Sequence, residues 1–280
     1  MGGVDAVDLA FGVTTDVGLR RKVNEDSALV VRPAFVVADG MGGYEAGDLA
    51  SRAVVDAFRD HVCTGEPVRL VDVSDALAEA ERRVTTIAAA TRRGAGSTLT
   101  GVVLLEYEGR PHWLVVNVGD SRVYRHFGAE LEQLTIDHSL AQELMDAGQL
   151  TEQERRTFDE RNVITRAIGA PDARADSWLM PVTNGERLLV CSDGLHGELM
   201  DEQIRAILTM SGRPAAAASA LVDAAKRTGG RDNITAIVVD VRSGGTDPAG
   251  DSSMSSSLIG SRREDTGADT TVDRAGTVPR

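Results

Sequence analysis

Residues 178–194 have the sequence WLMPVTNGERLLVCSDG, in which two apolar runs are separated by a short polar interval. The interval carries Asn184-Gly185, a dipeptide typical of the two-residue turn of a β-hairpin. The second run, 187–191, leads through Ser192 into Asp193-Gly194. This stretch therefore predicts two antiparallel strands, the second of which ends at a carboxylate.

The rest of the first 241 residues follows the same pattern. Strands are predicted where apolar residues run or alternate, and helices where they recur every three or four positions. Pairs of neighbouring strands outnumber β-α-β alternation, which favours an α+β fold of antiparallel sheets with flanking helices over a doubly wound parallel sheet. The expected strands are 9–16, 27–31, 34–39, 98–105, 113–118, 123–127 and 234–241, and the expected helices are 47–62, 73–91, 140–147, 202–210 and 215–226.

The composition is that of an ordinary globular protein, with 280 residues of which 42% are hydrophobic. Lys and Arg number 30 against 43 Asp and Glu, and the net charge of −13 argues against binding to nucleic acid or to anionic lipid. No apolar run of ~18 residues and no basic start before an apolar stretch occur, so neither a membrane span nor a secretory signal is predicted. The two cysteines, Cys63 and Cys191, provide no disulfide framework and no zinc cluster. We expect a cytoplasmic monomer.

The chain changes character after residue 241. Residues 242–280 contain no aromatic residue and are rich in Ser, Gly and Asp. Such a segment buries too little apolar surface to offset the entropy of ordering it. We therefore predict one domain over residues 1–241 and a disordered tail over 242–280.

Four aspartates stand next to an apolar run, each with a glycine close by. They are Asp39 after 35–38, Asp120 after 115–118, Asp193 after 188–191 and Asp232 before 234–241. An isolated Asp-Gly is usually only a turn. Its repetition at four strand ends predicts instead that these carboxylates meet at one end of the sheets.

Carboxylates that lie so close repel one another, and some of them bind protons unless cations offset the charge. A site made only of oxygen ligands selects Mg²⁺ or Mn²⁺ over zinc. Two such ions about 4 Å apart can activate a bridging water and hold a phosphoryl oxygen. The loop 15–27 adds Arg20-Arg21-Lys22, and a guanidinium beside a metal site suits bidentate binding of phosphate.

The sequence resembles the bacterial branch of the type 2C protein phosphatases, which are metal-dependent serine/threonine phosphatases. The resemblance covers about residues 9–241 and rests on six motifs that occur in the order of the family. They are Arg21-Lys22-Val23-Asn24-Glu25-Asp26, Ala38-Asp39-Gly40-Met41-Gly42-Gly43, Gly96-Ser97-Thr98-Leu99-Thr100, Val118-Gly119-Asp120-Ser121-Arg122, Cys191-Ser192-Asp193-Gly194-Leu195 and Arg231-Asp232-Asn233-Ile234-Thr235. The resemblance implies a four-layer α/β/β/α sandwich of two antiparallel sheets flanked by helix pairs.

The resemblance also implies a binuclear Mn²⁺ or Mg²⁺ centre. By motif match, Asp39 and Asp232 ligate one ion, Asp193 ligates the other, and Asp39 bridges the two. Gly40 contributes its carbonyl oxygen, and Glu25 reaches an ion through water. The implied activity is hydrolysis of phosphoserine and phosphothreonine on proteins by the bridging water. The implied partners are bacterial Ser/Thr kinases and their substrates.

Other positions have supporting roles in this interpretation. Arg21 matches the phosphate-binding arginine, and Asp120 with Asp193 matches a weaker third metal site. Asn233 and His138 are candidates for residues that support the metal ligands without binding an ion themselves. His138 either takes part in proton transfer or lies partly exposed beside a residue that caps the helix at 140–147. Met41 stands where animal members have a histidine, and its thioether cannot donate a proton to the leaving group.

Three other interpretations compete with this one. Residues 63–69 fit the Cys-x5-Arg pattern of cysteine-based phosphatases, but Pro67 removes a backbone donor and Glu66 adds a repelling charge. A catalytically weak module that only binds phosphoproteins would be free to lose its metal ligands, yet the aspartates are intact. A phosphohydrolase that acts on small molecules remains a third alternative.

Overall fold

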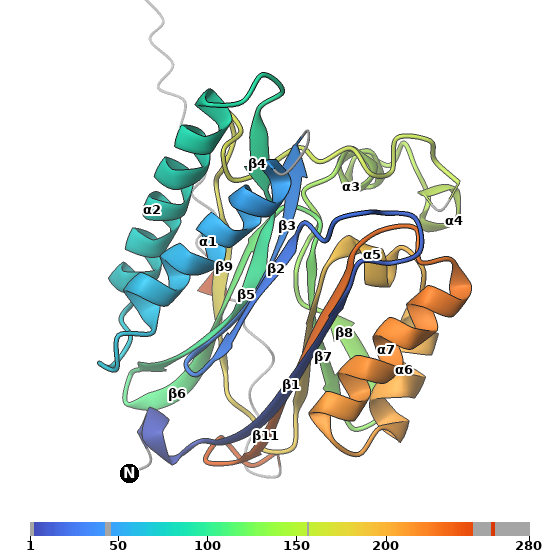
Figure 1. Cartoon of the computed structure of the whole chain (residues 1–280). Helices are drawn as coiled ribbons and strands as arrows, with labels where there is room; N and C mark the ends of the chain where they lie inside the picture. The colour runs from blue at the N-terminus through green and yellow to red at the C-terminus, as the bar shows by residue number, and fades with distance from the viewer. Residues whose placement is uncertain (1–2, 43–45, 156, 249–258, 261–280) are drawn as a thin grey trace, which may run out of the picture.

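The computed structural model describes residues 3–42, 46–155, 157–248 and 259–260. Two antiparallel sheets pack face to face, and a pair of helices covers the outer face of each sheet (Figure 1). The predicted α+β class and four-layer sandwich are therefore confirmed.

The first sheet has the strand order β1-β11-β10-β7-β8, and the second has the order β12-β9-β6-β5-β3-β2 with β4 paired to β3. The strands of the first sheet are β1 (Asp8–Asp16), β7 (Arg122–Phe127), β8 (Glu130–Gln133), β10 (Arg187–Cys191) and β11 (Ile234–Ser243). Those of the second are β2 (Asp26–Val31), β3 (Ala34–Gly42), β4 (Ala95–Ser97), β5 (Leu99–Tyr107), β6 (Arg110–Val118), β9 (Asp176–Pro181) and β12 (Ile259–Gly260).

Four long helices form the outer layers. The helices α1 (Ala46–Val62) and α2 (Leu70–Ala89) cover the second sheet, and α6 (Asp201–Met210) and α7 (Pro214–Thr228) cover the first (Figure 1). The shorter elements are a 3₁₀ turn at Val4–Ala6, α3 (Leu140–Asp146), α4 (Glu152–Arg155) and α5 (Asp193–His196). No helix in residues 3–42, 46–155 and 157–248 combines the length and the apolar character needed to cross a membrane.

The apolar interior has three parts, one between the sheets and one under each helix pair. The alternation of side chains along a strand produces this division. In β3, Phe35 and Val37 pack between the sheets, whereas Val36 packs under α1 and α2. In β10, Val190 packs between the sheets and Leu189 packs under α6 and α7. Both faces of these strands are buried, which explains why they read as continuous apolar runs.

The predicted hairpin at Asn184-Gly185 is wrong. The strand before it, β9, belongs to the second sheet, and the strand after it, β10, belongs to the first. Gly185 has a φ of +84°, as a turn requires, but its N–H donates to the carbonyl of Val241 at 2.9 Å. The buried carboxylate of Glu186 accepts from the indole N–H of Trp113 at 3.0 Å and from Arg125 at 2.6 Å. These contacts turn the segment into a crossover between the sheets.

The predicted boundary at residue 241 also lies too early. The strand β11 continues to Ser243, and Thr246 exchanges backbone hydrogen bonds with the 182–184 segment. Asn184 donates through its side chain to Asp247 at 2.6 Å. Residues 242–248 thus belong to the folded domain. The remaining predicted tail lies outside the described residues, apart from Ile259–Gly260, which pair with β9.

Candidate metal centre and active site

The aspartates chosen from the sequence lie close together, and both sheets contribute to the group. Asp39 lies in β3 of the second sheet, and Asp120 lies two residues after the end of β6 of the same sheet. Asp193 begins α5 after β10 of the first sheet, and Asp232 lies just before β11. The charges of Asp26, Asp193, Asp120 and Asp232 all act on Asp39, which shows that they share one region.

Two glycines let backbone segments approach within this region. A Cβ atom on Gly40 would lie only 2.0 Å from the carbonyl oxygen of Gly47 and 2.8 Å from that of Glu25. A Cβ atom on Gly194 would lie 2.0 Å from the carbonyl oxygen of Asn233. Each distance is far below van der Waals contact, so any larger residue would push the acidic segments apart. The glycines therefore set the spacing between the carboxylates.

The carboxylates destabilise one another's charged forms. Burial, followed by the negative charges around it, raises the pKa of Asp39 well above its ordinary range. Burial and the charge of Asp232 raise the pKa of Asp193 to about 6. Burial and the charge of Asp193 likewise raise the pKa of Asp120. The region holds more negative charge than its own side chains compensate.

Several buried oxygens in this region also lack a hydrogen-bond partner. Among the described residues they include Oδ1 of Asp26, Oδ1 of Asp120 and Oδ1 of Asp193. In the same part of the chain, no group of three or more His, Cys, Asp and Glu side chains is arranged so that it could hold a metal ion by itself. Mg²⁺ keeps several of its waters and commonly takes only one or two protein carboxylates. Unpartnered acidic oxygens in a shared region therefore fit hydrated divalent cations.

Asp26 belongs to this group, although the sequence did not single it out. It lies opposite Asp39 in the β2–β3 register. Its Oδ2 accepts hydrogen bonds from Ser192 at 2.8 Å and Thr235 at 2.7 Å, and burial raises its pKa to about 7. Its position after Glu25, at the start of a strand that pairs with β3, was the signal that could have identified it.

Arg21 lies at the edge of the acidic group. Its Nη2 contacts Oδ2 of Asp232 at 2.6 Å, and half of its side chain is exposed. Burial raises the pKa of Glu25 even though Arg21 acts in the opposite direction. The guanidinium is thus close to the carboxylates and still reachable from solvent.

Asn233 holds the loop that carries Arg21 and Glu25. Its Oδ1 accepts from the backbone N–H of Glu25 at 2.9 Å. Its Nδ2 donates to the carbonyls of Val17 at 3.0 Å and Val23 at 2.9 Å. Asn233 therefore holds the loop of Arg21 and Glu25 against the segment that carries Asp232.

His138 does not face the acidic group, and the expectation that it is partly exposed is wrong. It is buried, with Nδ1 against the backbone N–H of Gly119 at 3.1 Å and Nε2 against Asp176 at 3.0 Å. Ser139 caps α3 by accepting from the backbone of Gln142, as one of the two predicted caps. The side chain of Met41 lies beside Gly96.

The alternative site at 63–69 is not supported by the structure. The segment connects the end of α1 to the start of α2, and no strand leads into it. Burial raises the pKa of the Cys63 thiol, which disfavours the thiolate that such chemistry requires. Arg69 is engaged by Asp72, with Nη2 and Oδ1 2.6 Å apart.

Comparison with known proteins identifies the family. The family model described as protein phosphatase 2C matches residues 21–226. Serine/threonine protein phosphatase PstP of Mycobacterium tuberculosis is 35% identical over 242 residues, which cover 83% of this chain and 45% of that protein. Serine/threonine phosphatase stp of Listeria monocytogenes is 31% identical over 240 residues, which cover 81% of this chain and 93% of that protein. The chain belongs to the protein phosphatase 2C family.

A solved structure shares the fold at similar identity. The catalytic domain of PstP in complex with two manganese ions aligns with a TM-score of 0.76 and 32% identity, covering 85% of this chain and 99% of that one. This chain spans about half the length of the mycobacterial relative and nearly all of the Listeria relative.

Proposed function

We propose that this protein is a Mn²⁺- or Mg²⁺-dependent phosphatase that hydrolyses phosphoserine and phosphothreonine on proteins. The observation that carries the proposal is the group of buried aspartates from both sheets whose pKa values stay raised even where an arginine acts on them, as Arg122 does on Asp120 and Arg21 on Asp193. Relatives at 31–35% identity are named serine/threonine phosphatases, and one related catalytic domain holds two manganese ions.

Each side chain has a proposed role. Asp39, Asp193 and Asp232 hold two ions, Gly40 offers its carbonyl, and Glu25 contributes through water. Bound divalent ions supply a water activated for attack on phosphorus and offset the charge of the phosphoryl oxygens. Asp120 holds a weaker third ion together with Asp193.

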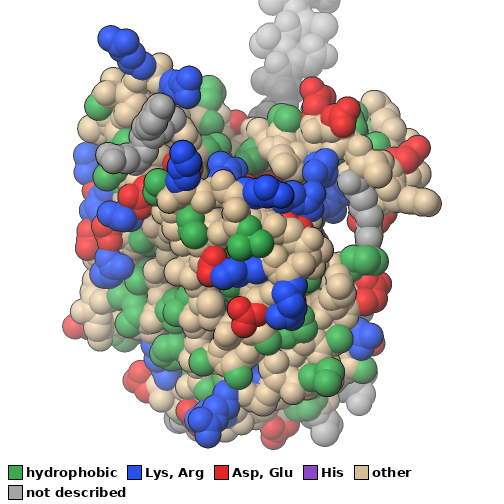
Figure 2. All heavy atoms as spheres, turned by 45° about the vertical axis from the view of Figure 1, so that its right-hand side comes forward, with side chains coloured by type: hydrophobic (Ala, Val, Ile, Leu, Met, Phe, Trp, Pro, Cys, Tyr) green, Lys and Arg blue, Asp and Glu red, His purple; other side chains and the backbone are tan. Residues whose placement is uncertain are grey.

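Arg21 is proposed to bind the phosphoryl group of the substrate. In the structure its guanidinium contacts Asp232, and substrate phosphate offers it a competing bidentate acceptor. Lys and Arg side chains gather across the upper part of the face shown in Figure 2, where they would attract a doubly charged phosphate. The phosphoproteins made by bacterial Ser/Thr kinases are the proposed substrates.

The decisive experiment measures turnover of a phosphothreonine peptide and of a small aryl phosphate, each with Mn²⁺ and after chelation. Mn²⁺-dependent turnover with a higher kcat/KM on the peptide supports the proposal. Preference for the small ester indicates a small-molecule phosphohydrolase. Peptide binding without turnover at any metal concentration indicates a regulatory binding module.

A further inference from the structure

The main chain around Asp120 is held from two sides by histidines. The residue before it, Gly119, is bound through both of its backbone groups by His138. The carbonyl oxygen of Asp120 itself faces Nε2 of His196 at 3.0 Å. His138 precedes α3 and His196 ends α5, so two separate parts of the chain converge on one dipeptide.

The contact of His138 with Gly119 defines the tautomer of its ring. The N–H of Gly119 donates to Nδ1 at 3.1 Å, so Nδ1 is an acceptor and carries no proton. The proton of the neutral ring is then on Nε2, which donates to Oδ2 of Asp176 at 3.0 Å. Nη1 of Arg166 lies 3.2 Å from the same nitrogen and donates to Oδ1 of Asp176 at 3.1 Å. The backbone N–H of His138 also donates to the carbonyl of Gly119 at 2.9 Å.

Gly119 needs such support because of its backbone conformation. Its φ of +110° lies in the region that side chains rarely adopt, and a Cβ atom there would lie 2.6 Å from Cγ2 of Thr98. Asn117 adds a hydrogen bond from Nδ2 to the Gly119 carbonyl at 3.1 Å. The turn that positions the Asp120 carboxylate lies outside any helix or strand, and hydrogen bonds from neighbouring residues hold it in place.

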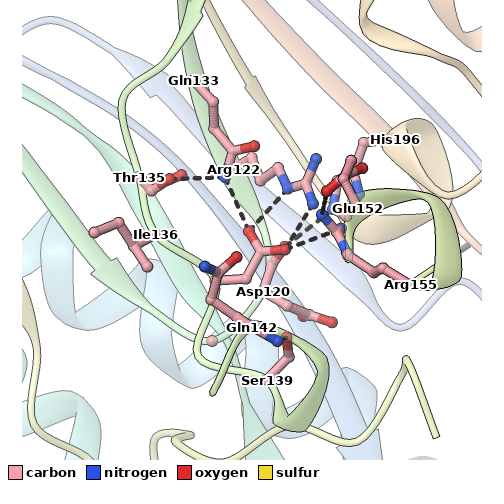
Figure 3. A network of polar contacts seen from close by, with 12 residues as sticks. Asp120, Arg122, Gln133, Thr135, Ile136, Ser139, Gln142, Glu152, Arg155 and His196 are labelled. Atoms are coloured by element: carbon pink, nitrogen blue, oxygen red, sulfur yellow. Dashed lines mark hydrogen bonds and ion pairs between the residues drawn. The ribbon is translucent and has the colours of Figure 1, made fainter. Parts of the chain in front are cut away.

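His138 is itself anchored on both sides along the chain. The preceding residue, Asp137, receives a two-pronged ion pair from Arg122, with Nε–Oδ1 and Nη2–Oδ2 distances of 2.8 and 2.6 Å. Gln133 also contacts Oδ1 of this carboxylate at 3.1 Å, and Arg155 contacts Oδ2 at 3.4 Å. Figure 3 shows Arg122, Gln133 and Arg155 near one another, with Asp120 beside them. The following residue, Ser139, caps α3. The ring is therefore a rigid support for Gly119.

His196 supports the other side in the same way. A carbonyl oxygen only accepts, so Nε2 of His196 carries the proton that bonds to Asp120. His196 lies in the same short helix as Asp193. The imidazole of His196 thus links the segment of Asp120 to the segment of Asp193.

We propose that His138 and His196 are positioning residues for Asp120 and thereby set the affinity of the cation site that Asp120 forms. The proposal rests on the assignment of Asp120 as a cation ligand in the proposed function. Neither histidine is proposed as a ligand of the ion. Each acts through the backbone that directs the Asp120 carboxylate. Supports of this kind typically change metal affinity about 10–100-fold.

Paired substitutions separate the two sides of the His138 ring. His138→Asn keeps an acceptor near the position of Nδ1, whereas His138→Gln keeps a donor near that of Nε2 and loses the acceptor. His196→Gln keeps the donor to Asp120, and His196→Leu loses it. Asp120→Asn is the reference for loss of the site. Mn²⁺ binding is measured by titration calorimetry on the full chain, and melting in chelator establishes that each variant is folded.

We expect His138→Gln and His196→Leu to weaken the weakest Mn²⁺ site about tenfold or more, while the tighter sites keep their affinity. His138→Asn and His196→Gln should stay within about threefold of the wild type, as rescue by the retained hydrogen bond requires. In the Asp120→Asn background, His138→Gln should cause no further loss.

The outcomes are distinguishable. If Asp120→Asn binds Mn²⁺ as the wild type does, the third site of the proposed function is wrong. If Asp120→Asn weakens the site but His138→Gln and His196→Leu do not, the positioning role is overturned. Equal losses in His138→Asn and His138→Gln, both folded, overturn the role of the Gly119 contact.

Discussion

Asp120 and Asp137 are buried to almost the same extent, with 5% and 4% of their surface exposed, yet their carboxyl groups behave in opposite ways. Arg122 and Arg155 lower the pKa of Asp137 in spite of its burial. Burial and the neighbouring charges of Asp193 and Asp137 raise the pKa of Asp120. The difference follows from the charges beside each carboxyl group, because arginines contact Asp137 directly, whereas the strongest neighbouring charge on Asp120 is that of Asp193.

The same contrast runs through the molecule. Asp240 near the opposite end of β11 receives a two-pronged pair from Arg187, with the shorter contact at 2.6 Å. Asp26, Asp39 and Asp193 receive no such fork among the described residues. The protein supplies its own cation where a carboxylate is structural. It leaves the buried carboxylates of Asp39 and Asp193, proposed here as metal ligands, without such a fork, whereas the more exposed Asp232 pairs with Arg21.

The largest effect is expected from removing an uncompensated carboxylate. Asp39→Asn and Asp193→Asn should each lower kcat on a phosphothreonine peptide by more than about 100-fold, because the ions and the charge stabilisation they provide are lost. Both variants should remain folded by circular dichroism. Rates close to the wild type in either variant, with Mn²⁺ bound, would remove that residue from the site.

Removing a compensated carboxylate should instead damage stability. Asp137→Asn leaves the buried guanidinium of Arg122 without its anionic partner, which we expect to cost about 3–5 kcal/mol of unfolding free energy. Asp39→Asn relieves repulsion and should not lower stability in the absence of metal. Urea unfolding of both variants in chelator measures the difference. Equal losses of unfolding free energy in Asp137→Asn and Asp39→Asn would show that the two classes of carboxylate do not differ in their effect on stability.

The pH dependence of the unfolding free energy tests whether the buried carboxylates of the candidate site have raised pKa values. Asp26 and Asp193 have pKa values raised to about 7 and about 6, so the folded state holds protons that the unfolded chain releases. Their contribution to stability is greatest below about pH 4 and is lost as the pH rises through these values.

His196 acts in the opposite direction, because burial lowers its pKa to about 3 and only the unfolded chain takes up its proton. The carboxylates outnumber it, so without metal we expect unfolding free energy to fall by about 2 kcal/mol between pH 5 and pH 7.5. Saturating Mn²⁺ should reduce this fall. A metal-free stability that rises steadily over this range would contradict the raised pKa values.

A smaller effect is expected from substitution of Arg21, because this residue pairs with Asp232 at the exposed edge of the acidic group. Arg21→Ala should raise KM for the phosphopeptide about tenfold and change kcat less, since binding of ground-state phosphate is mostly uniform binding. Arg20→Ala is the matched control and should change KM little. An unchanged KM in Arg21→Ala would transfer the role to Arg20 or Lys22.

The smallest effect is expected at the C-terminus. Removal of residues 249–280 takes away the two-residue pairing of Ile259–Gly260 with β9 and should change the free energy of unfolding by less than about 0.5 kcal/mol, at the low end of a hydrogen bond's net contribution. Removal from residue 244 onward also takes away the backbone bonds of Thr246 and should cost about 1–2 kcal/mol. Thermal melting of the two truncations compares them. Equal melting temperatures would show that 244–248 contribute nothing to the fold.

Most strands and long helices were predictable because their signals are local. In β3 the residues 34–38 form a continuous buried apolar run, and in α1 the apolar residues recur at helical spacing. Four-residue elements such as β8 and α5 were missed, because so few residues carry no measurable period. The helix α2 starts at Leu70, before its expected start, since Asp72 accepts from the backbone of Arg69.

The acidic residues of the candidate site were predictable to a similar degree. Asp39, Asp120, Asp193 and Asp232 each follow or precede an apolar run, a pattern contained within a few residues. Asp26 escaped notice because its importance depends on its register opposite Asp39, together with hydroxyl donors from Ser192 and Thr235. Those donors are far from it in sequence.

The sequence by itself determined most of the longer strands, the antiparallel class of the sheets, and the placing of carboxylates at strand ends, because these properties follow from local periodicity and from the residues at strand ends. Only the tertiary structure decided that Asn184-Gly185 joins two sheets and does not close a hairpin, since the partner of Gly185 is Val241. It also decided which buried aspartate forms an ion pair with Arg122 and which buried aspartate has its charge free to bind another cation. A carboxylate's pKa depends on the charges and burial around it in space, and residues distant along the chain supply both.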